Sequence, residues 1–358
     1  MHGGDIYNNS VDIDFSVNLN PYRLSGEDER AIKLAMSEGL ENAGYYPDIR
    51  QTDVRAAIAE AEEVGIENVI AGSGASELIM AVTSFAAPRK ALLIEPCYSG
   101  YEHAISSVAD CNIVRYCLKE EDGFTLTSEV LDAITDDTDI MFVSDPVNPT
   151  GKNIDDDLLG KMFDRAQRKG VTVVYDTSFL TLSDKYAGRE GTDWQSYVNK
   201  YDNLFILGSY TKNFALPGLR MGYIMSTKRN IAGLTAHLPE WNLSCVAASV
   251  MKACAGISNR SDHLKRSLEL IKKEREYLSE ELSKTGFKVY ESDTVFILIK
   301  DEKGLFEDLY ESLLAQGILI RKCNDFYGLG KGYYRIAVRC HDDNIILTDT
   351  IRKITDEG

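Results

Sequence analysis

The sequence predicts an α/β protein built on a mostly parallel β-sheet that helices cover on both faces. Between about residues 67 and 226, short apolar runs alternate with amphipathic stretches, a pattern typical of alternating strands and helices. The segment 259–285 is rich in Lys, Glu, Arg and Leu and predicts one long charged helix. A second, shorter alternation follows it, so we expect a smaller α/β unit toward the C-terminus.

Each predicted strand of the larger unit is a short apolar run. These runs lie at 68–71, 91–95, 112–117, 139–144, 172–176, 204–208 and 222–226. Helical periodicity separates most of them, at 75–85, in part of 98–107 and at 155–168. In the smaller unit we expect strands at 295–300, 318–322 and 334–338, a helix near 305–316 and a last helix. The predicted domains are an N-terminal arm that contributes to the small domain and the active site (1–44), a large domain (45–249) and a small domain (250–358).

The composition restricts the partners that the protein can bind. With 39 basic and 56 acidic side chains, the formal net charge is −17. Nucleic acid and anionic membranes are disfavoured, because binding to phosphate groups in a row depends on clustered Lys and Arg. No apolar run reaches the ~18 residues of a transmembrane helix, and no secretory signal is visible. We therefore expect a cytoplasmic protein.

The cysteines and histidines give little support for a metal site. The seven cysteines are scattered and never spaced C-x-x-C, and the five histidines form no H-x-x-x-H pair. Such spacing is typical of buried free thiols in a reducing cytoplasm, rather than of a disulfide framework or a zinc site. We expect no metal.

Candidate site residues follow the predicted strands, because ligands of open α/β sheets bind at the carboxyl ends of the strands. The strand at 68–71 leads into Gly72-Ser73-Gly74-Ala75-Ser76 and then a helix. Small residues before a helix N-terminus leave N–H groups free to bind an anion. Three interpretations remain open: a phosphate cup, a plain tight turn, or a dinucleotide-binding fingerprint with Glu95 at the end of the next strand. The fingerprint lacks its third glycine, which Glu77 replaces.

The segment 208–222 holds one lysine, Lys212, and one arginine, Arg220, among small and apolar residues. A lysine with a depressed pKa is the usual Schiff-base nucleophile toward an aldehyde. Arg220 and the Ser209 hydroxyl are natural ligands for phosphate. Taken alone, a lysine such as Lys212 is more often a solvated side chain on a loop than a nucleophile.

Two further strand ends carry polar residues. The strand at 139–144 leads into 145–151, which contains Asn148, and the strand at 172–176 ends in Asp176. A buried carboxylate would keep a pyridine nitrogen protonated, and Asn148 could donate a hydrogen bond to a phenolic oxygen. Singly, Asn-Pro-x-Gly is usual in turns, and an aspartate at a strand end is often a helix N-cap. Together with Lys212 and Arg220, however, these residues occupy successive strand ends.

The combination of Ser209-x-x-Lys212-x(7)-Arg220 with Asn148-Pro149-Thr150-Gly151 resembles the fold-type I pyridoxal-phosphate enzymes of the aminotransferase class I/II group. The resemblance covers essentially the whole chain. It implies a seven-stranded, mostly parallel sheet in an α/β/α sandwich, with a smaller C-terminal α/β domain. It also implies pyridoxal 5'-phosphate as the cofactor and Lys212 as the catalytic residue. The implied cofactor-binding residues are Tyr46, Gly74, Ala75, Ser76, Tyr98, Asn148, Asp176, Ser209, Thr211, Lys212 and Arg220.

The resemblance also implies what these residues do. The cup of Ala75 and Ser76, with Ser209 and Arg220, resembles the site of the cofactor phosphate. Asp176 matches the partner of the pyridine nitrogen.

Around the cofactor ring, Asn148 matches the partner of the ring hydroxyl. Tyr98 matches the aromatic residue that stacks on the ring. Tyr46 matches a tyrosine contributed by the neighbouring subunit, which implies a homodimer with shared active sites.

Two further matches narrow the resemblance. His2-Gly3-Gly4, followed by the segment 14–21 that contains Asn18, is similar to the threonine-phosphate decarboxylases of cobalamin synthesis. The segments around Arg321 and Arg335 strengthen that likeness. In that family and in the histidinol-phosphate aminotransferases, the matching arginines engage the phosphate or carboxylate of the substrate. A small phosphorylated amino acid or amine is thus the implied substrate, with His2 and Asn18 beside it. A histidine at residue 2 is otherwise most often part of a disordered surface.

The chain departs from the family pattern at several positions. Thr177-Ser178 replaces the usual Glu-Ala, Asp145 replaces a common Asn, and Phe179 replaces a Tyr found in many aminotransferases. Phe179 agrees with the decarboxylases, whereas Thr177-Ser178 agrees with neither family.

Three functions are therefore compatible with these residues. The first is a decarboxylase of threonine phosphate or a similar substrate, which forms an external aldimine at Lys212 and loses CO2. The second is an aminotransferase of the histidinol-phosphate type that transfers an amino group to 2-oxoglutarate. Both use the same residues, and the Cα bond that stands perpendicular to the cofactor ring decides between them. The third, a non-catalytic regulator, is disfavoured because no basic helix-turn-helix extension is present.

Overall fold

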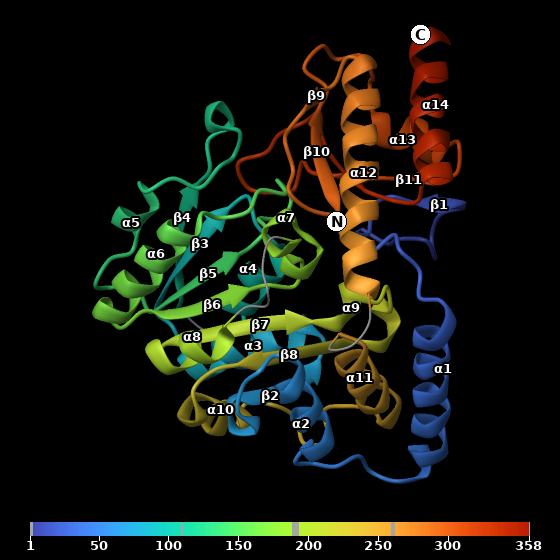
Figure 1. The fold of residues 1–358 in the computed structure, drawn as a ribbon. Helices are drawn as coiled ribbons and strands as arrows, with labels where there is room; N and C mark the ends of the chain where they lie inside the picture. Colours follow the sequence, from blue (N-terminus) through green and yellow to red (C-terminus); the bar gives the residue numbers. More distant parts are fainter. Residues whose placement is uncertain (1–2, 109, 188–192, 259–261, 358) are drawn as a thin grey trace.

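A computed structural model describes residues 3–108, 110–187, 193–258 and 262–357 (Figure 1). Its larger sheet has seven strands in the order β2-β8-β7-β6-β5-β3-β4. Strand β8 pairs antiparallel with both β2 and β7, and the other neighbours are parallel. The predicted mostly parallel sheet is confirmed. The strands are β2 (Val69–Ser73), β3 (Lys90–Glu95), β4 (Asn112–Cys117), β5 (Ile140–Ser144), β6 (Thr172–Asp176), β7 (Leu204–Ser209) and β8 (Met221–Met225).

The central strands are buried on both faces. This burial explains why each of them is a continuous apolar run in the sequence. Successive side chains of a strand point to opposite faces. Leu92 and Val173 therefore belong to one hydrophobic core, whereas their neighbours Leu93 and Val174 belong to another. The helices of this part are α2 (Thr52–Ala61), α3 (Ala75–Ala86), α4 (Ser99–Ile105), α5 (Val130–Ala133), α6 (Asp156–Lys169), α7 (Asp184–Ala187), α8 (Trp194–Lys200), α9 (Tyr210–Asn213), α10 (Lys228–Thr235) and α11 (Cys245–Ser258).

Helix α6 shows why the predicted helices form where they do. The side chain of Asp155 caps its N-terminus by accepting a hydrogen bond from the Leu158 N–H at 3.0 Å. Basic residues occupy its last turn, and Gly170 ends it in the left-handed conformation with φ of 71°. One face of the helix is buried against the sheet, through Leu158, Leu159, Met162, Phe163 and Ala166.

A smaller antiparallel sheet, in the order β12-β13-β10-β9, forms a separate part with its own hydrophobic core. The long helix α12 runs along this part and reaches down to the larger sheet, with α14 beside it (Figure 1). The elements are β9 (Lys288–Val289), β10 (Phe296–Lys300), β12 (Arg321–Lys322), β13 (Tyr333–Ala337), α12 (His263–Lys284), α13 (Leu309–Leu314) and α14 (His341–Glu357).

The predicted strand at 318–322 is wrong as a single strand. It divides into β11 (Ile318–Leu319), which pairs parallel with β1 (Ile13–Asp14), and β12, which pairs with β13. Phe15 causes the change of partner. Its N–H donates to the carbonyl of Leu319 at 2.7 Å, and its own carbonyl accepts from Ala337 at 2.9 Å. The N-terminal segment is thereby inserted between two strands of the smaller part.

Two predicted helices are shorter in the structure. The helix expected near 305–316 covers only α13, because the Asp301 carboxylate accepts the N–H groups of Leu305 and Phe306 and holds the preceding residues in a loop. The long helix begins at His263, and residues 259–261 lie outside the described residues. Helix α1 (Gly26–Glu41) packs against α11, and the predicted domain boundary at 249 falls inside α11. The division into domains stays a prediction.

All seven cysteines are free, as expected. The expectation that they are buried holds for Cys97, Cys254 and Cys323, but it is wrong for Cys117 and Cys340, which are exposed, and Cys111 and Cys245 are only half-buried. Within the described part of the chain, no helix has both the length and the apolar character needed to cross a bilayer.

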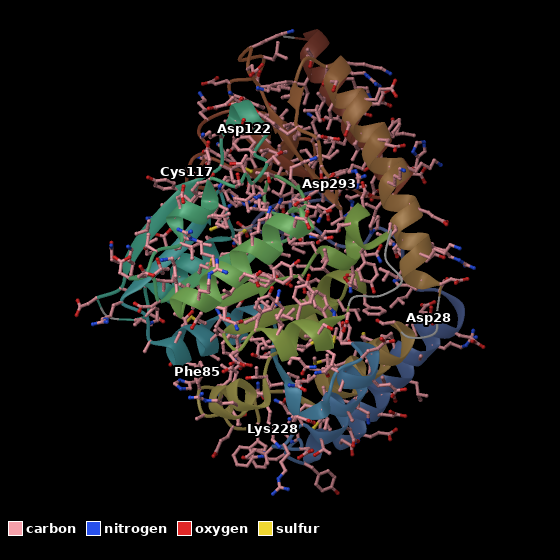
Figure 2. The ribbon with its side chains drawn as sticks, turned by 60° about the vertical axis from the view of Figure 1, so that its left-hand side comes forward. Asp28, Phe85, Cys117, Asp122, Lys228 and Asp293 are labelled. Carbon is pink, nitrogen blue, oxygen red and sulfur yellow. The ribbon has the colours of Figure 1, made fainter. Side chains whose placement is uncertain are left out.

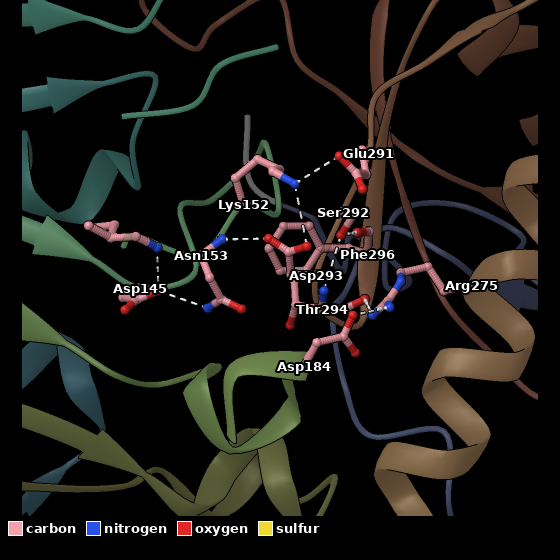
Figure 3. Close-up of polar contacts among 11 residues, drawn as sticks. Asp145, Lys152, Asn153, Asp184, Arg275, Glu291, Ser292, Asp293, Thr294 and Phe296 are labelled. Atoms are coloured by element: carbon pink, nitrogen blue, oxygen red, sulfur yellow. Dashed lines mark hydrogen bonds and ion pairs between the residues drawn. The ribbon is translucent and has the colours of Figure 1, made fainter. Parts of the chain in front are cut away.

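Polar contacts join the two parts of the molecule around the site. Glu120, in the short helix η3 (Glu120–Asp122), accepts hydrogen bonds from Lys288 at 2.8 Å and from Tyr333 at 2.6 Å. Figure 2 shows Asp122 of this helix next to the smaller part. A second group of contacts lies around Asp293, whose carboxylate accepts the Asn153 N–H at 2.8 Å (Figure 3). The remaining 3₁₀ helices are η1 (Asn42–Gly44), η2 (Ile66–Asn68), η4 (Leu180–Leu182) and η5 (Pro217–Leu219).

Candidate active site

One cavity of about 220 Å³ lies at the carboxyl ends of the parallel strands, where the smaller sheet faces the larger one. Its lining comes from residues after β2, β3, β5, β6 and β7, from the N-terminal segment, and from β12 and β13. The structure therefore brings together predicted residues from distant parts of the sequence. The predicted residues that line it are Asn18, Ala75, Ser76, Tyr98, Asn148, Asp176, Ser209, Thr211, Lys212, Arg220, Arg321 and Arg335.

Three predicted residues are not among the lining residues. Gly74 lies just before Ala75 and contacts the site through Arg220. Tyr46 is 80% exposed, and its ring packs against Trp241 with 4.8 Å between the ring centroids. Its predicted role belongs to the cavity of a second copy. His2 lies outside the described residues, although Gly3 lines the cavity.

Lys212 is carried by a short turn between β7 and β8. Because Ser209 pairs with Gly222 across these antiparallel strands, the segment that holds Lys212 begins and ends at one point of the sheet. The hydroxyls of Ser209 and Thr211 both donate to the carbonyl of Met221 at 3.1 Å. They therefore brace the turn while they line the cavity.

The environment of Lys212 favours its neutral amine. Burial, followed by the positive charges of Arg335 and Arg220, lowers the pKa of Lys212 from 10.5 to about 8. The amine lies 5.6 Å from the centre of the Phe179 ring. A lysine with such a pKa is available as a nucleophile or a base near neutral pH.

The N-terminus of α3 and Arg220 form an anion cup. Gly74, with φ of +83°, precedes the helix, and a Cβ at this position would lie 2.6 Å from the Arg220 guanidinium. Glycine is thus required both by the backbone and by the close approach of Arg220. Free N–H groups, the helix dipole and a guanidinium together suit a phosphate. Of the three interpretations of this segment, the geometry agrees with the phosphate cup.

Asp176, the last residue of β6, is buried and lines the cavity. Its carboxylate accepts hydrogen bonds from the Tyr101 hydroxyl at 2.7 Å and the Ser178 N–H at 2.9 Å. Burial, and then the Asp176 charge, raises the pKa of Tyr101 well above its usual value, so Tyr101 stays a donor. Sequence reasoning missed Tyr101. Its position one helical turn after Tyr98, at the start of α4, was the available signal.

A second missed residue is Gly100. A Cβ there would lie 2.2 Å from the ring of Tyr98, so only glycine leaves room for that ring. Tyr98 then contacts Tyr101 edge-to-face, with 5.5 Å between the ring centroids.

Arg335 and Asn148 connect the two sheets at the cavity. Arg335 donates to the side-chain oxygen of Asn148 at 2.6 Å and to the carbonyl of Ser16 at 2.7 Å. Both acceptors are uncharged, and the buried Nε of Arg335 has no acceptor among the described residues. Burial lowers the pKa of Arg335 to about 10, which still leaves it charged at neutral pH.

Arg321 lies directly opposite Arg335 in the β12–β13 pair. Its Nη2 donates to both carboxylate oxygens of Asp325, at 2.8 and 3.0 Å, and its guanidinium lies over the ring of Phe326 at 4.8 Å. Phe326 and Asp325, which sequence reasoning did not single out, lie in the loop that follows β12.

The departures from the family pattern have structural explanations. Thr177 donates its hydroxyl to the Leu207 carbonyl at 2.8 Å, so it helps to join β6 and β7. Ser178 lines the cavity, and its buried hydroxyl has no partner among the described residues. Asp145 is fully buried and forms an ion pair with Lys185 at 2.7 Å (Asp145 is labelled in Figure 3).

The residues fit a phosphorylated pyridine aldehyde. The cup suits its phosphate, Asp176 its ring nitrogen, Asn148 its phenolic oxygen and Lys212 its aldehyde. Among the described residues, Asn18 Oδ1 and the Ser178 hydroxyl have no hydrogen-bond partner, which indicates that the cavity is built to receive a polar ligand. Among the described residues, no group of His, Cys, Asp and Glu is placed to hold a metal ion.

The fold and this cavity define a pyridoxal-phosphate-dependent enzyme. Residues 10–347 match the family described as aminotransferase class I and II, and the chain belongs to that family. The match covers both sheets and every described residue of the cavity except Gly3.

Named relatives fall into two groups. Over 350 residues the chain is 32% identical to the adenosylcobalamin biosynthesis bifunctional protein CobDQ of Leptospira interrogans, covering 96% of this chain but 38% of that protein. It is 28% identical over 344 residues to the threonine-phosphate decarboxylase of Salmonella typhimurium, covering 96% and 91% of the two chains.

The second group consists of histidinol-phosphate aminotransferases, and solved structures represent it. The histidinol-phosphate aminotransferase of Clostridium acetobutylicum has a TM-score of 0.85 and 29% identity, with 97% of this chain and 100% of that chain covered. The Sinorhizobium meliloti histidinol-phosphate aminotransferase, solved in complex with pyridoxal 5'-phosphate, also has a TM-score of 0.85, over 98% of this chain and 93% of that chain. Its 15% identity supports the shared fold only.

Proposed function

We propose that this protein decarboxylates a phosphorylated amino acid such as threonine phosphate, with pyridoxal 5'-phosphate as its cofactor. The observation that carries the proposal is the meeting of Lys212, Asp176 and Asn148 with two further arginines, Arg321 and Arg335, in one cavity. The first three suit the cofactor. The two arginines supply positive charge for a substrate that is itself anionic.

When bound, the cofactor supplies an electron sink for the bond that breaks at the substrate Cα. Asp176 would hold the ring nitrogen of the bound cofactor protonated, and Tyr101 keeps Asp176 in place by donating to it at 2.7 Å. Asn148 would donate to the phenolic oxygen. Lys212, with its pKa of about 8, accepts or returns a proton near the Cα.

The arginines determine which Cα bond breaks, because they hold the anionic groups of the substrate. If the phosphate is bound by Arg321 and Arg335, these arginines would not hold the carboxylate, which could then be the group that leaves as CO2. Phe179 supports this reaction, since it places an apolar ring beside Lys212 where many aminotransferases carry a hydroxyl. The similarity to the threonine-phosphate decarboxylase of Salmonella typhimurium also supports it.

A histidinol-phosphate aminotransferase is the second candidate. It is supported by the solved structure at 29% identity and by a cavity that would serve both reactions. With a substrate that has no carboxylate, Lys212 would act as the base toward the Cα–H instead, which would favour transamination. We infer a cytoplasmic location for either enzyme.

We also propose a homodimer in which Tyr46 reaches the cavity of the second copy. The exposed aromatic patch of Tyr45, Tyr46 and Trp241 supports an interface, because large apolar side chains are costly to leave in water. Light scattering of the purified protein tests this proposal. A monomeric mass would overturn it.

One assay tests the reaction. The protein is incubated with threonine phosphate, and CO2 is measured in parallel with glutamate formed from 2-oxoglutarate. CO2 without glutamate supports the decarboxylase, and glutamate formation with histidinol phosphate supports the aminotransferase. The absence of both products with threonine, serine and histidinol phosphates would overturn the substrate assignment.

The cofactor assignment needs a separate measurement. The purified protein should absorb in the visible band of a pyridoxal Schiff base. Lys212→Ala should abolish that band. An unchanged band in Lys212→Ala would contradict the role of Lys212.

A further inference from the structure

The two cavity arginines differ in how their charges are balanced. Among the described residues, the acceptors of Arg335 are uncharged: the side chain of Asn148 and the carbonyl of Ser16. Arg321, in contrast, makes a two-oxygen contact with the Asp325 carboxylate. In the described part of the chain, therefore, one guanidinium of the pair is neutralised and the other is not.

The positions of the arginines make this difference important. They are directly opposite each other across β12 and β13, where side chains are close neighbours and like charges destabilise the pair. With Asp325 in contact, the two arginines and the aspartate carry a net charge of +1. Without Asp325 the arginines present +2, which matches a phosphate dianion.

Asp325 has somewhere to move. The side chain of Arg321 is 7% exposed, but that of Asp325 is 35% exposed. Arg321 lines both the active-site cavity and a neighbouring cavity of about 460 Å³, and Asp325 lines only the second of these two. Asp325 also lines a further cavity, together with Ser76 and Tyr98. These neighbouring cavities give the carboxylate space beside Arg321.

We propose that Asp325 occupies Arg321 as a counter-ion within the chain until the phosphate of the substrate replaces it. A dianion replaces Asp325 because it gains contacts with both guanidinium groups. Asp325 thereby lowers the affinity of the cavity for any anion that needs Arg321, until that anion displaces it. This inference rests on the proposed function of the arginines as substrate anchors.

The test measures binding without turnover, on the cofactor-loaded protein. Inorganic phosphate is titrated by calorimetry into the wild type, Asp325→Asn and Asp325→Ser, with acetate as the monoanionic comparison. Loss of the competing charge should tighten phosphate binding by roughly five- to tenfold. Acetate binding should also tighten in both variants, because acetate no longer competes with a tethered carboxylate.

Arg339 and Asp343 offer a matched control. They form the same i,i+4 arginine–aspartate contact, at 2.8 Å, but neither lines the cavity. Asp343→Asn should leave phosphate binding unchanged. Phosphate binding that is unchanged or weaker in folded Asp325→Asn and Asp325→Ser would overturn the proposal, because Asp325 would then only orient Arg321.

The outcome is separable from the proposed reaction. Tighter phosphate binding in the Asp325 variants together with no turnover of any phosphorylated substrate would support the exchange and refute the reaction. Turnover of threonine phosphate by the wild type, with no effect of the Asp325 substitutions on phosphate binding, would support the reaction and refute the exchange.

Discussion

The side-chain oxygen of Asn148 accepts a hydrogen bond from Nη1 of Arg335 at 2.6 Å. A guanidinium only donates, so this contact fixes which end of the amide faces Arg335. The amide nitrogen of Asn148 is then left as the donor for a ligand. One arginine of the smaller sheet thus sets the hydrogen-bonding character of a residue that follows the larger sheet.

Arg335→Lys should disturb both the substrate and Asn148. Lysine lacks the forked geometry that serves Asn148 and Ser16 together. We expect KM for the phosphorylated substrate to rise more than tenfold, and the pH at which the cofactor absorption band changes to shift. Arg339→Lys is the control, since Arg339 does not line the cavity. An Arg335→Lys protein with wild-type KM and band titration would contradict this role.

Lys212→Met should stabilise the protein without cofactor at pH 7. The pKa of Lys212 is about 8 in the folded chain, against 10.5 as its ordinary value. Between these values the unfolded chain binds more protons, so this group's contribution to the free energy of unfolding rises with pH. Below pH 8 the buried charge costs about 3 kcal/mol, which methionine removes. Urea unfolding at pH 7 and pH 10 measures the effect, and the gain should shrink at the higher pH.

Gly74→Ala should weaken cofactor binding more than it destabilises the fold. Alanine is strained at φ of +83°, and its Cβ would displace the Arg220 guanidinium. Gly123→Ala is a matched control, because Gly123 has φ of +61° but no atom within 4 Å of the added Cβ. Both variants should lose about 1 kcal/mol of stability. Only Gly74→Ala should lose tenfold or more in cofactor affinity, measured by titration of the unliganded protein. Equal affinities in the two variants would count against the cup.

Lys185→Met should destabilise the protein by about 3–5 kcal/mol, because it leaves the buried Asp145 charge unpaired. The double variant with Asp145→Asn should recover much of that loss. Asparagine removes the charge. The recovery is incomplete because Asn153 and Tyr175 both donate to the Asp145 carboxylate, and the amide NH2 of asparagine cannot accept a hydrogen bond. A double-mutant cycle by chemical denaturation gives the coupling free energy. Additive losses would show that the pair does not act as a unit.

The larger sheet and most of the cavity could be predicted from the sequence because their signals are local. A parallel strand buried on both faces is a short apolar run, and the functional residue follows it immediately, as Asp176 follows Tyr175. The division of 318–322 between two sheets had no such signal. It depends on Phe15, which lies about 300 residues away in the chain and inserts between the strands.

Contacts between side chains could also not be predicted from the sequence pattern. Nothing in the spacing of Arg321 and Asp325 distinguishes their ion pair from the similar pair of Arg339 and Asp343. Only the placement of one pair on the cavity separates them. The exposure of Cys117 likewise follows from the position of β4 at the edge of the sheet.

The pairing of Ser209 with Gly222 has a consequence for how the enzyme tolerates sequence change. The chain between these partners leaves the sheet and returns to it at a single point. The distance between Lys212 and Arg220 therefore depends on the residues of that segment rather than on distant elements. Substitutions that shift distant helices do not change this spacing. The segment should therefore be transplantable as a unit between relatives, and replacing residues 209–222 together should be milder than exchanging its residues one at a time.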